Sequence, residues 1–308
     1  MEKPKMILAG GTGFLGSNLA RHFTGLGYQV VVLGRDRKPA PGFVHWNGRT
    51  IGPWAAELEG AAAVINLAGR TVDCRYNEAN KYAIVRSRTE STRVLGEAIV
   101  ACRNPPAVWM NSSTATIYES VDTDHPANTE QDGLIGSSFS EMVAQKWEAE
   151  FWLAATPRTR RLALRTAIVL GRDGGALPVM ARLARLGLCT SQGSGQQWIS
   201  WLHAADFCRS IEFLLAHANL QGTFNLCAPH PLRNAAFNGL LDQHFRPRWH
   251  LPQPRWLPEI GAFLLRTETE LILKSRKVVP QRLLEAGFRF LYPTCDLALT
   301  DLLPARTR

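Results

Sequence analysis

Three glycines at intervals of three residues form the first segment of the sequence whose residue types could do chemistry. The segment 9–16, Ala-Gly-Gly-Thr-Gly-Phe-Leu-Gly, follows an apolar strand-like run and opens an amphipathic stretch at 14–26, which is typical of a strand, a glycine turn and a helix. Gly10 allows a tight turn, Gly13 lets backbone N–H groups approach a pyrophosphate, and Gly16 lets the helix pack on the strand. The helix N-terminus would stabilise the phosphate charge. The candidate cofactor contacts in this turn are Gly10, Thr12, Gly13, Phe14, Leu15 and Gly16. The alternative is a strand-to-helix turn that binds nothing.

The end of the second strand-like run indicates which dinucleotide would bind. Gly34 and Arg35 stand where NAD enzymes usually place an acidic residue. A carboxylate there would repel a 2′-phosphate, whereas a guanidinium can bind it with paired hydrogen bonds. We therefore expect NADP(H), bound through Arg35 with Arg37 and Lys38 as further candidates. Two alternatives stay open. A one-residue shift in register would place Asp36, instead of Arg35, against the ribose, or the segment is a solvated turn that binds no ligand.

Strand-like and helical patterns alternate through the first half of the chain and would position these residues. The strand-like runs are 6–9, 29–33, 62–68, 107–110 and 162–170, and the helical patterns cover 14–26, 77–101 and 139–155. Such alternation predicts a parallel sheet with helices on both faces. The fold class that we expect is α/β, a Rossmann-like doubly wound parallel sheet.

The regular alternation of strand-like and helical patterns ends after Gly171, and we expect a smaller C-terminal substrate lobe there. Glycine-bearing loops, a helix from Asp206 and a short strand at 223–227 are followed by clustered prolines. These loops would lie over the carboxyl ends of the strands. The expected domains are an NADP-binding Rossmann domain at 1–170, to which 204–228 returns, and a lobe formed mainly by 171–308.

Composition excludes several classes of protein. A hydrophobic share of 45% over 308 residues supplies ample core and excludes intrinsic disorder. The 35 Lys and Arg against 26 Asp and Glu give a net charge of +9, but the basic residues are spread along the chain. This distribution favours an anionic small ligand, or simply a soluble surface, over nucleic-acid binding. The six cysteines show no CxxC pair and no zinc spacing, so we expect no metal and a reducing compartment. No apolar run approaches the roughly 18 residues that a membrane span needs, so we expect a soluble cytoplasmic protein without a membrane partner.

Four segments together resemble the extended short-chain dehydrogenase/reductase (SDR) superfamily, which contains the NAD(P)-dependent epimerases and dehydratases. They are the Gly-x-x-Gly-x-x-Gly turn at 10–16, Val-Ile-Asn-Leu-Ala-Gly at 64–69, Ser-Ser-Thr-Ala-Thr-Ile-Tyr at 112–118, and the stretch 193–206. Further segments resemble the atypical "epimerase family protein" branch, which carries a C-terminal domain of unknown function. They are 147–148, 165–171, 193–198, Trp201, His203, 279–280 and 287–290.

The resemblance implies roles for residues at two strand ends and on one helix. Leu67, Ala68 and Gly69 would close over the adenine ribose and diphosphate, and Arg88 is a candidate for a ligand anion. SDR enzymes pair a Ser or Thr with a Tyr and with a Lys four residues after that Tyr. Thr114 matches the hydroxyl position, with Ser113 as its nearest substitute, and Lys146 matches the lysine that binds the nicotinamide ribose.

The tyrosine position is occupied by Met142, whose thioether has no exchangeable proton. This departure leaves cofactor binding intact and questions ordinary SDR catalysis. Substitute proton donors are Tyr118, Lys146 acting through water, and Glu141 or His203. A tyrosine at position 118 usually belongs to a structural turn in the family.

The second lobe contributes the candidate substrate residues Trp198, Trp201 and His203. Sugar-nucleotide enzymes commonly place an arginine seven residues before the aspartate of this segment, and here Ile199 takes that place, which argues against a nucleotide sugar. The two tryptophans could stack on a flat ring or be ordinary core residues.

Two functions follow from these expectations. The first is an NADP(H)-dependent oxidoreductase or epimerase acting on a small carbonyl or hydroxy substrate. The second is an NADP(H)-binding sensor with little or no turnover. The resemblance would also imply a homodimer paired through two helices.

Overall fold

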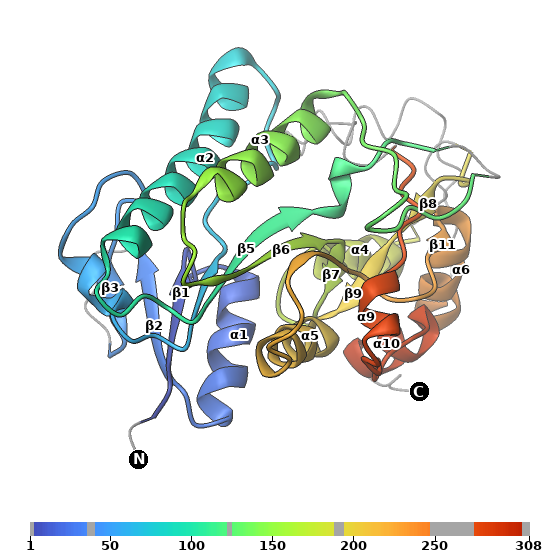
Figure 1. Ribbon diagram of the computed structural model, residues 1–308. Coiled ribbons are helices and arrows are strands. Elements are labelled where there is room, and N and C mark those ends of the chain that lie inside the picture. Colours follow the sequence, from blue (N-terminus) through green and yellow to red (C-terminus); the bar gives the residue numbers. More distant parts are fainter. Residues whose placement is uncertain (1–2, 36–40, 122–124, 188–193, 247–273, 304–308) are drawn as a thin grey trace.

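Seven strands form one parallel sheet in the computed structural model (Figure 1), which describes residues 3–35, 41–121, 125–187, 194–246 and 274–303. The strand order is β10-β6-β5-β4-β1-β2-β3, and every neighbouring pair is parallel. The strands are β1 (Lys5–Ala9), β2 (Gln29–Gly34), β3 (Phe43–His45), β4 (Ala63–Asn66), β5 (Val108–Thr114), β6 (Arg160–Thr166) and β10 (Gly222–Leu226). The order runs outward from β1 in both directions, as in a doubly wound Rossmann-like fold, and the expected fold class is confirmed.

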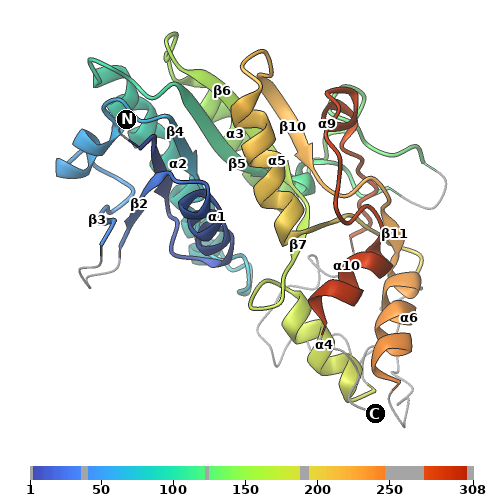
Figure 2. The same ribbon diagram turned by 90° about the horizontal axis from the view of Figure 1, so that it is seen from below.

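A smaller lobe gathers at one end of the molecule, away from β1, β2 and β3 (Figure 2). Its helices are α4 (Leu177–Arg185), α6 (Asn234–Phe245) and α10 (Cys295–Leu302). Two small sheets join them: β7 (Ile168–Leu170) with β9 (Trp201–His203), and β8 (Trp198–Ile199) with β11 (Leu232–Arg233). Leu177, Trp201, Phe237 and Leu299 belong to the apolar cluster at its centre. The short helix α9 (Gln281–Glu285) packs on β10, and its Leu283 belongs to the core of the main sheet.

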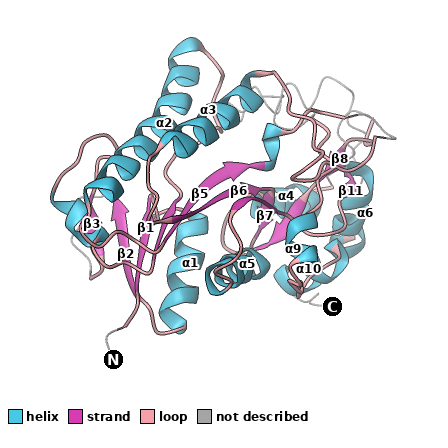
Figure 3. Cartoon of the chain, in the orientation of Figure 1, coloured by secondary structure: helices cyan, strands magenta, loops and turns pink. Residues whose placement is uncertain are grey.

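Helices cover both faces of the main sheet (Figure 3). The helices α1 (Phe14–Gly25) and α5 (Ala204–Ala216) lie on one face, and α2 (Glu78–Ala101) and α3 (Phe139–Leu153) lie on the other. Alternate side chains of β1 divide between the two layers, because Met6 and Leu8 pack with the first pair of helices whereas Ile7 packs with the second. Two 3₁₀ turns, η1 (Pro53–Leu58) and η2 (Ala115–Ile117), complete this part.

Arginine side chains bind the carbonyl groups at the C-terminal ends of two of these helices. Arg160 donates to the carbonyl oxygens of Leu214 and Leu215 at 2.9 and 3.0 Å, at the C-terminus of α5. Arg161 does the same at the end of α3, with a 2.8 Å bond to the oxygen of Ala154. Guanidinium groups stabilise the carbonyls that a helix end leaves unpaired, so part of the excess positive charge is structural.

Two expected elements differ from the observed ones. The run 162–170 is two strands, because the chain leaves the sheet after Thr166 and β7 pairs with β9 instead. The helix expected from Asp206 begins at Ala204, since the ring nitrogen Nδ1 of His203 accepts the N–H of Ala205 at 2.9 Å and caps the helix. The side chain of Asp206 is buried and accepts from the backbone N–H groups of Leu291 and Tyr292.

Within the residues that the structure describes, no helix combines the length and the hydropathy that a bilayer span requires.

Candidate functional site

In the glycine turn, Gly10 and Gly16 are packed closely against other backbone atoms, whereas Gly13 faces open space. Gly10 has φ 73°, and a Cβ placed on it would lie 2.6 Å from the Cα of Ala68. A Cβ on Gly16 would lie 2.3 Å from the carbonyl oxygen of Gly11. Gly13 caps α1 without a side-chain hydrogen bond, and a Cβ there would meet no atom within 4 Å. The free end of the helix therefore faces open space at Gly13, which suits an anionic group.

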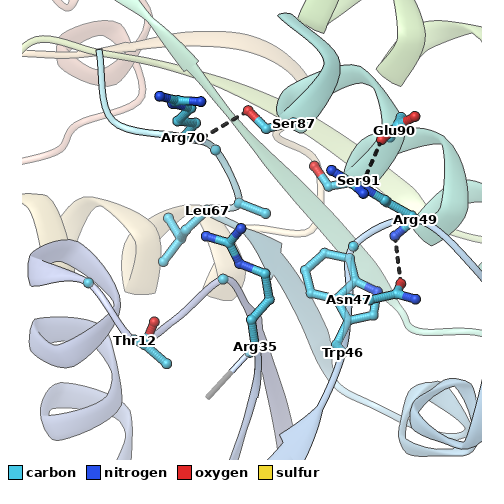
Figure 4. A pocket seen from close by; sticks show the side chains of 16 residues that line it. Thr12, Arg35, Trp46, Asn47, Arg49, Leu67, Arg70, Ser87, Glu90 and Ser91 are labelled. Atoms are coloured by element: carbon cyan, nitrogen blue, oxygen red, sulfur yellow. Dashed lines mark hydrogen bonds and ion pairs between the residues drawn. The ribbon is translucent and has the colours of Figure 1, made fainter. Parts of the chain in front are cut away.

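A pocket of about 500 Å³ opens over this turn (Figure 4). It lies at the carboxyl ends of β1, β2 and β4 and is closed by the segment after β3 and by one face of α2. Its lining consists of Gly10, Thr12, Gly13, Gly34, Arg35, Trp46, Asn47, Gly48, Arg49, Leu67, Ala68, Gly69, Arg70, Ser87, Glu90 and Ser91. Its volume is in the range of cofactor and ligand sites.

Seven of the expected cofactor contacts lie together in this lining. They are Gly10, Thr12, Gly13, Arg35, Leu67, Ala68 and Gly69. Arg35 is exposed at the end of β2. Arg37, Lys38 and Asp36, the other candidates at this strand end, lie outside the described residues.

Other expected contacts are placed elsewhere. The lining does not include Leu15, Gly16 or Lys146. The ring of Phe14 packs on the loop after β7, since a Cβ on Gly171 would lie 2.3 Å from its Cζ. Arg88 lies behind Gly69, where its guanidinium donates to the carbonyl oxygens of Arg70 and Ile84 at 3.1 Å. Burial lowers the pKa of Arg88 to about 10.

Sequence reasoning missed the outer wall of the pocket. Trp46, Asn47, Gly48 and Arg49 follow β3, a strand of three residues without a periodic signature. Ser87, Glu90 and Ser91 come from the middle of α2, where only packing decides which face meets the pocket. The helical spacing of these three could have marked them as one face, but not as a ligand face.

The lining carries more positive than negative charge. Arg35, Arg49 and Arg70 bring three guanidinium groups, and Glu90 is the single carboxylate among the residues of the lining. The carboxylate of Glu90 lies 3.3 Å from Nε of Arg49 and 2.5 Å from Nε of Arg86. A concave site with this excess of cations favours a polyanionic ligand.

Thr114 and Lys146 lie at the carboxyl end of β5 and on α3. The hydroxyl of Thr114 accepts the N–H of Thr116 at 3.1 Å and contacts the hydroxyl of Thr116 at 2.9 Å. Lys146 is exposed, and no hydrogen bond or ion pair within the described part of the chain engages its ammonium group. Met142 is 44% exposed, one helical turn before it on the same face. The exposed face of α3 therefore carries an amine and a thioether one helical turn apart.

Ser113 and Tyr118 belong instead to a buried polar network. Ser113 donates to Glu148 at 2.5 Å, and Arg165 donates to the same carboxylate at 2.9 and 2.8 Å. The hydroxyl of Tyr118 donates to Asn225 at 2.8 Å and accepts from Arg165 at 3.0 Å. Burial raises the pKa of Tyr118 despite the charge of Arg165. Both hydroxyls have hydrogen-bond partners inside the protein, and their catalytic roles stay predictions.

Glu141 is also engaged. Its buried carboxylate accepts from Arg276 at 2.7 Å and from Lys274 at 2.9 Å. Burial alone would raise the pKa of Glu141, but hydrogen bonds from Ser138 and Lys274 and the charge of Arg276 lower it. A carboxylate held in the charged form is no substitute acid.

Of the three substrate candidates in the second lobe, Trp201 and His203 are buried and Trp198 is half-buried. Trp201 is 0% exposed and belongs to the lobe core, and its indole N–H donates to the carbonyl of His230. His203 caps α5 and stacks on Tyr292 with ring centroids 3.8 Å apart. Both side chains are buried and bonded within the protein, and their role as substrate contacts stays a prediction. Trp198 is half-buried, with the guanidinium of Arg233 3.9 Å from its ring centre.

Comparison with known proteins adds the family. The model described as the NAD dependent epimerase/dehydratase family matches residues 6–227, and a model of a domain of unknown function (DUF1731) matches residues 253–302. The chain belongs to the NAD-dependent epimerase/dehydratase family. This confirms the family resemblance that the motifs indicate.

Relatives of this epimerase/dehydratase chain match it almost end to end. The human epimerase family protein SDR39U1 is 31% identical over 302 residues, which cover 97% of this chain and 99% of the relative. An epimerase family protein of Staphylococcus epidermidis is 32% identical over 307 residues, with 98% and 99% covered.

Solved structures that resemble the fold include a human protein and a bacterial one. The crystal structure of human SDR39U1 (isoform 2) with NADPH superimposes with a TM-score of 0.86 at 29% identity, covering 97% of this chain and 98% of that chain. A nucleoside-diphosphate sugar epimerase from Corynebacterium glutamicum, at 24% identity and TM-score 0.78, covers 98% of this chain and 58% of that chain and supports the fold alone.

Proposed function

We propose that this epimerase/dehydratase family protein binds NADP(H) in the pocket over the glycine turn and uses it on a small carbonyl or hydroxy substrate. The observation that carries the proposal is the combination in one pocket of an uncapped helix end at Gly13 with Arg35 at the end of β2. The first suits a pyrophosphate, and the second suits a 2′-phosphate. The NADPH in the structure of the human relative supports the same cofactor.

The residues of the pocket fit such a cofactor. Gly13 leaves open space where the phosphates would approach the backbone, and Gly10 and Gly16 let the turn pack tightly beneath them. When bound, the nicotinamide supplies hydride transfer. Thr114 would polarise a carbonyl at the end of β5, and Lys146 would bind the ribose from α3.

Proton transfer is the unusual part of the proposal. Met142 cannot donate a proton, and Tyr118, Glu141 and His203 are engaged in buried contacts. Lys146, exposed and unpaired among the described residues, is the remaining candidate and would act through a water molecule. Trp198 stays a candidate for substrate contact, and a homodimer, a cytoplasmic location and the division into a Rossmann domain and a substrate lobe stay predictions.

Met142 also favours a second function, an NADP(H) sensor with little or no turnover. The two functions share the binding step and differ in chemistry. NADPH oxidation over a panel of small carbonyl compounds separates them, with Thr114→Ala as the comparison. Substrate-dependent oxidation that falls by at least about tenfold in Thr114→Ala supports the enzyme, and identical traces with every compound support the sensor.

Binding itself is tested with Gly13→Asp. A Cβ at this position meets no protein atom within 4 Å, so the fold should persist, but the new carboxylate would repel the phosphates. Gly239→Asp is a matched control on α6, since a Cβ there also meets no atom within 4 Å. We expect NADPH to raise the melting temperature of the wild type and of Gly239→Asp, and not that of Gly13→Asp. A wild-type protein whose melting temperature and tryptophan emission ignore NADPH would overturn the proposal.

A further inference from the structure

A carboxylate lies on the wall of a pocket that otherwise carries cations. Glu90 shares the lining with Arg35 and Arg49. Close to a phosphate, an uncompensated carboxylate would weaken binding by like-charge repulsion. The ion-pair partners of Glu90 compensate its negative charge, and they indicate what Glu90 does in the pocket.

The two oxygens of Glu90 are held differently. Oε1 lies 2.5 Å from Nε of Arg86, one turn earlier on α2, in a hydrogen bond between residues four apart. Oε2 lies 3.3 Å from Nε of Arg49, is shielded from solvent and makes no hydrogen bond. The side chain of Glu90 is 16% exposed, whereas that of Arg49 is 62% exposed. The contact with Arg49 is therefore Coulombic, and Arg49 can leave it while the bond to Arg86 persists.

The backbone that carries Arg49 is fixed. The side-chain oxygen of Asn47 accepts the N–H groups of Arg49 and Thr50 at 2.8 and 3.0 Å. Trp46, just before this turn, donates its N–H to the carbonyl of Gly34 at 2.8 Å. This bond ties the turn to the strand end that carries Arg35. Arg49 can therefore change partners by side-chain rotation alone, within the same pocket as Arg35 (Figure 4).

We propose that Arg49 is a second ligand of the 2′-phosphate and that its ion pair with Glu90 sets the discrimination between NADPH and NADH. In the free protein Glu90 holds Arg49 against α2. A phosphate dianion draws Arg49 away, and Glu90 stays compensated by Arg86. NADH lacks this phosphate, so Arg49 stays with Glu90. This inference rests on the proposed binding of NADP(H) and adds the residues that select it.

Substitutions of Arg49, Glu90 and Arg86 should then change NADPH affinity in different directions. Arg49→Gln removes a ligand and should weaken NADPH binding by about tenfold. Glu90→Gln releases Arg49 and removes a repulsive charge, and should tighten NADPH binding by roughly two- to fivefold. Arg86→Gln leaves Glu90 with Arg49 alone, so that Arg49 is released less readily and NADPH binds more weakly. NADH affinity should change by less than about twofold in each variant.

The chain offers a matched control on the same helix. Arg93 and Glu97 are likewise four residues apart on α2, with 3.6 Å between Nε and Oε1, and both are half-exposed outside the pocket. Arg93→Gln and Glu97→Gln change the net charge as Arg86→Gln and Glu90→Gln do. They should leave the ratio of the two dissociation constants unchanged, which separates a local effect from the overall charge.

The experiment measures dissociation constants for NADPH by calorimetry and for NADH directly or by displacement, at one pH and one ionic strength. The double variant Glu90→Gln/Arg49→Gln decides the mechanism, because without Arg49 the gain from Glu90→Gln should shrink to the repulsive part alone. Selectivity that falls in Arg49→Gln and rises in Glu90→Gln supports the inference. A wild type that prefers NADPH while Arg49→Gln keeps the full preference overturns the inference and leaves the proposed function standing. A wild type that binds neither cofactor overturns both.

Discussion

Ser113 donates a 2.5 Å hydrogen bond to Oε1 of Glu148, and this bond fastens the carboxyl end of β5 to α3. Ser113 directly precedes Thr114, and Glu148 lies two residues after Lys146. Because Arg165 of β6 grips the same carboxylate with two hydrogen bonds, three elements meet at one buried charge. This junction therefore helps to set the position of Thr114 relative to Lys146.

Loss of the charge at this junction should be costly. Glu148→Gln leaves the buried guanidinium of Arg165 without its counter-ion, and breaking such a pair costs about 3–5 kcal/mol of the free energy of unfolding. Urea unfolding measures it. Glu97→Gln, which breaks the exposed pair with Arg93, should change the free energy by less than about 1 kcal/mol. A cost for Glu148→Gln no larger than that of the control would show that the junction does not hold the sheet and α3 together.

The glycine turn allows a test of packing on one helix. Gly16→Ala forces a Cβ to 2.3 Å from the backbone of Gly11 and should destabilise the protein by about 1–3 kcal/mol. Gly25→Ala, at the other end of α1, meets no atom within 4 Å and should stabilise it by up to about 1 kcal/mol. Thermal unfolding of the two variants should therefore shift in opposite directions, and a common direction would contradict the close approach at Gly16.

Local geometry explains why sequence reasoning found the inner half of the pocket. A positive φ at Gly10 and the near contact at Gly16 are requirements that only glycine meets, and they leave a spacing that can be read without the fold. The charge of Arg35 at a strand end is equally local. The outer half, with Trp46, Arg49 and Glu90, depends on how a three-residue strand and the middle of α2 approach each other. No local pattern encodes that approach.

The second lobe shows the same limit. Trp201 and His203 stand in a motif that suggested ligand contact, yet their partners come from segments far along the chain. The imidazole of His203 meets Tyr292 and Asp301, and Trp201 meets His230. Burial by distant segments is decided by tertiary packing, so the sequence near residue 200 could not distinguish a core tryptophan from a ligand platform.

His203 should make stability depend on pH. Burial lowers its pKa below 6.5, against the opposing effect of Asp301. In the unfolded chain the imidazole binds a proton near pH 6.5, whereas in the folded protein it does so only at lower pH. The stabilisation is therefore complete above pH 6.5 and is lost as the pH falls through the folded-state pKa. His203→Asn keeps an oxygen acceptor for the helix cap and removes the titration.

The measurement is the free energy of unfolding in urea at pH 7.5 and 5.5. The wild type should lose more stability between these values than His203→Asn, even though the variant is less stable at pH 7.5 because its contacts with Tyr292 and Asp301 are gone. Parallel losses in the two proteins would show that another group carries the acid sensitivity.

Met142 permits a direct test of the missing proton donor. It is 44% exposed and one helical turn before Lys146, so a tyrosine there should fit without strain and leave the free energy of unfolding within about 0.5 kcal/mol of the wild type. The ammonium of Lys146 nearby should stabilise the phenolate, so that the new tyrosine titrates below its usual pKa near 10. Difference absorbance between Met142→Tyr and Met142→Phe isolates that titration.

The same pair of variants decides what the methionine does. If the pocket binds NADPH and lacks only an acid, Met142→Tyr should accelerate NADPH oxidation with a reactive carbonyl compound by about 10²–10⁴, the range of general acid catalysis. Met142→Phe, which has the same ring without the hydroxyl, should not. Equal rates in the two variants, together with a normal pKa for the new tyrosine, would show that residue 142 does not face the reacting group. The candidate reaction face of α3 would then have to be abandoned, although cofactor binding at the glycine turn would be untouched.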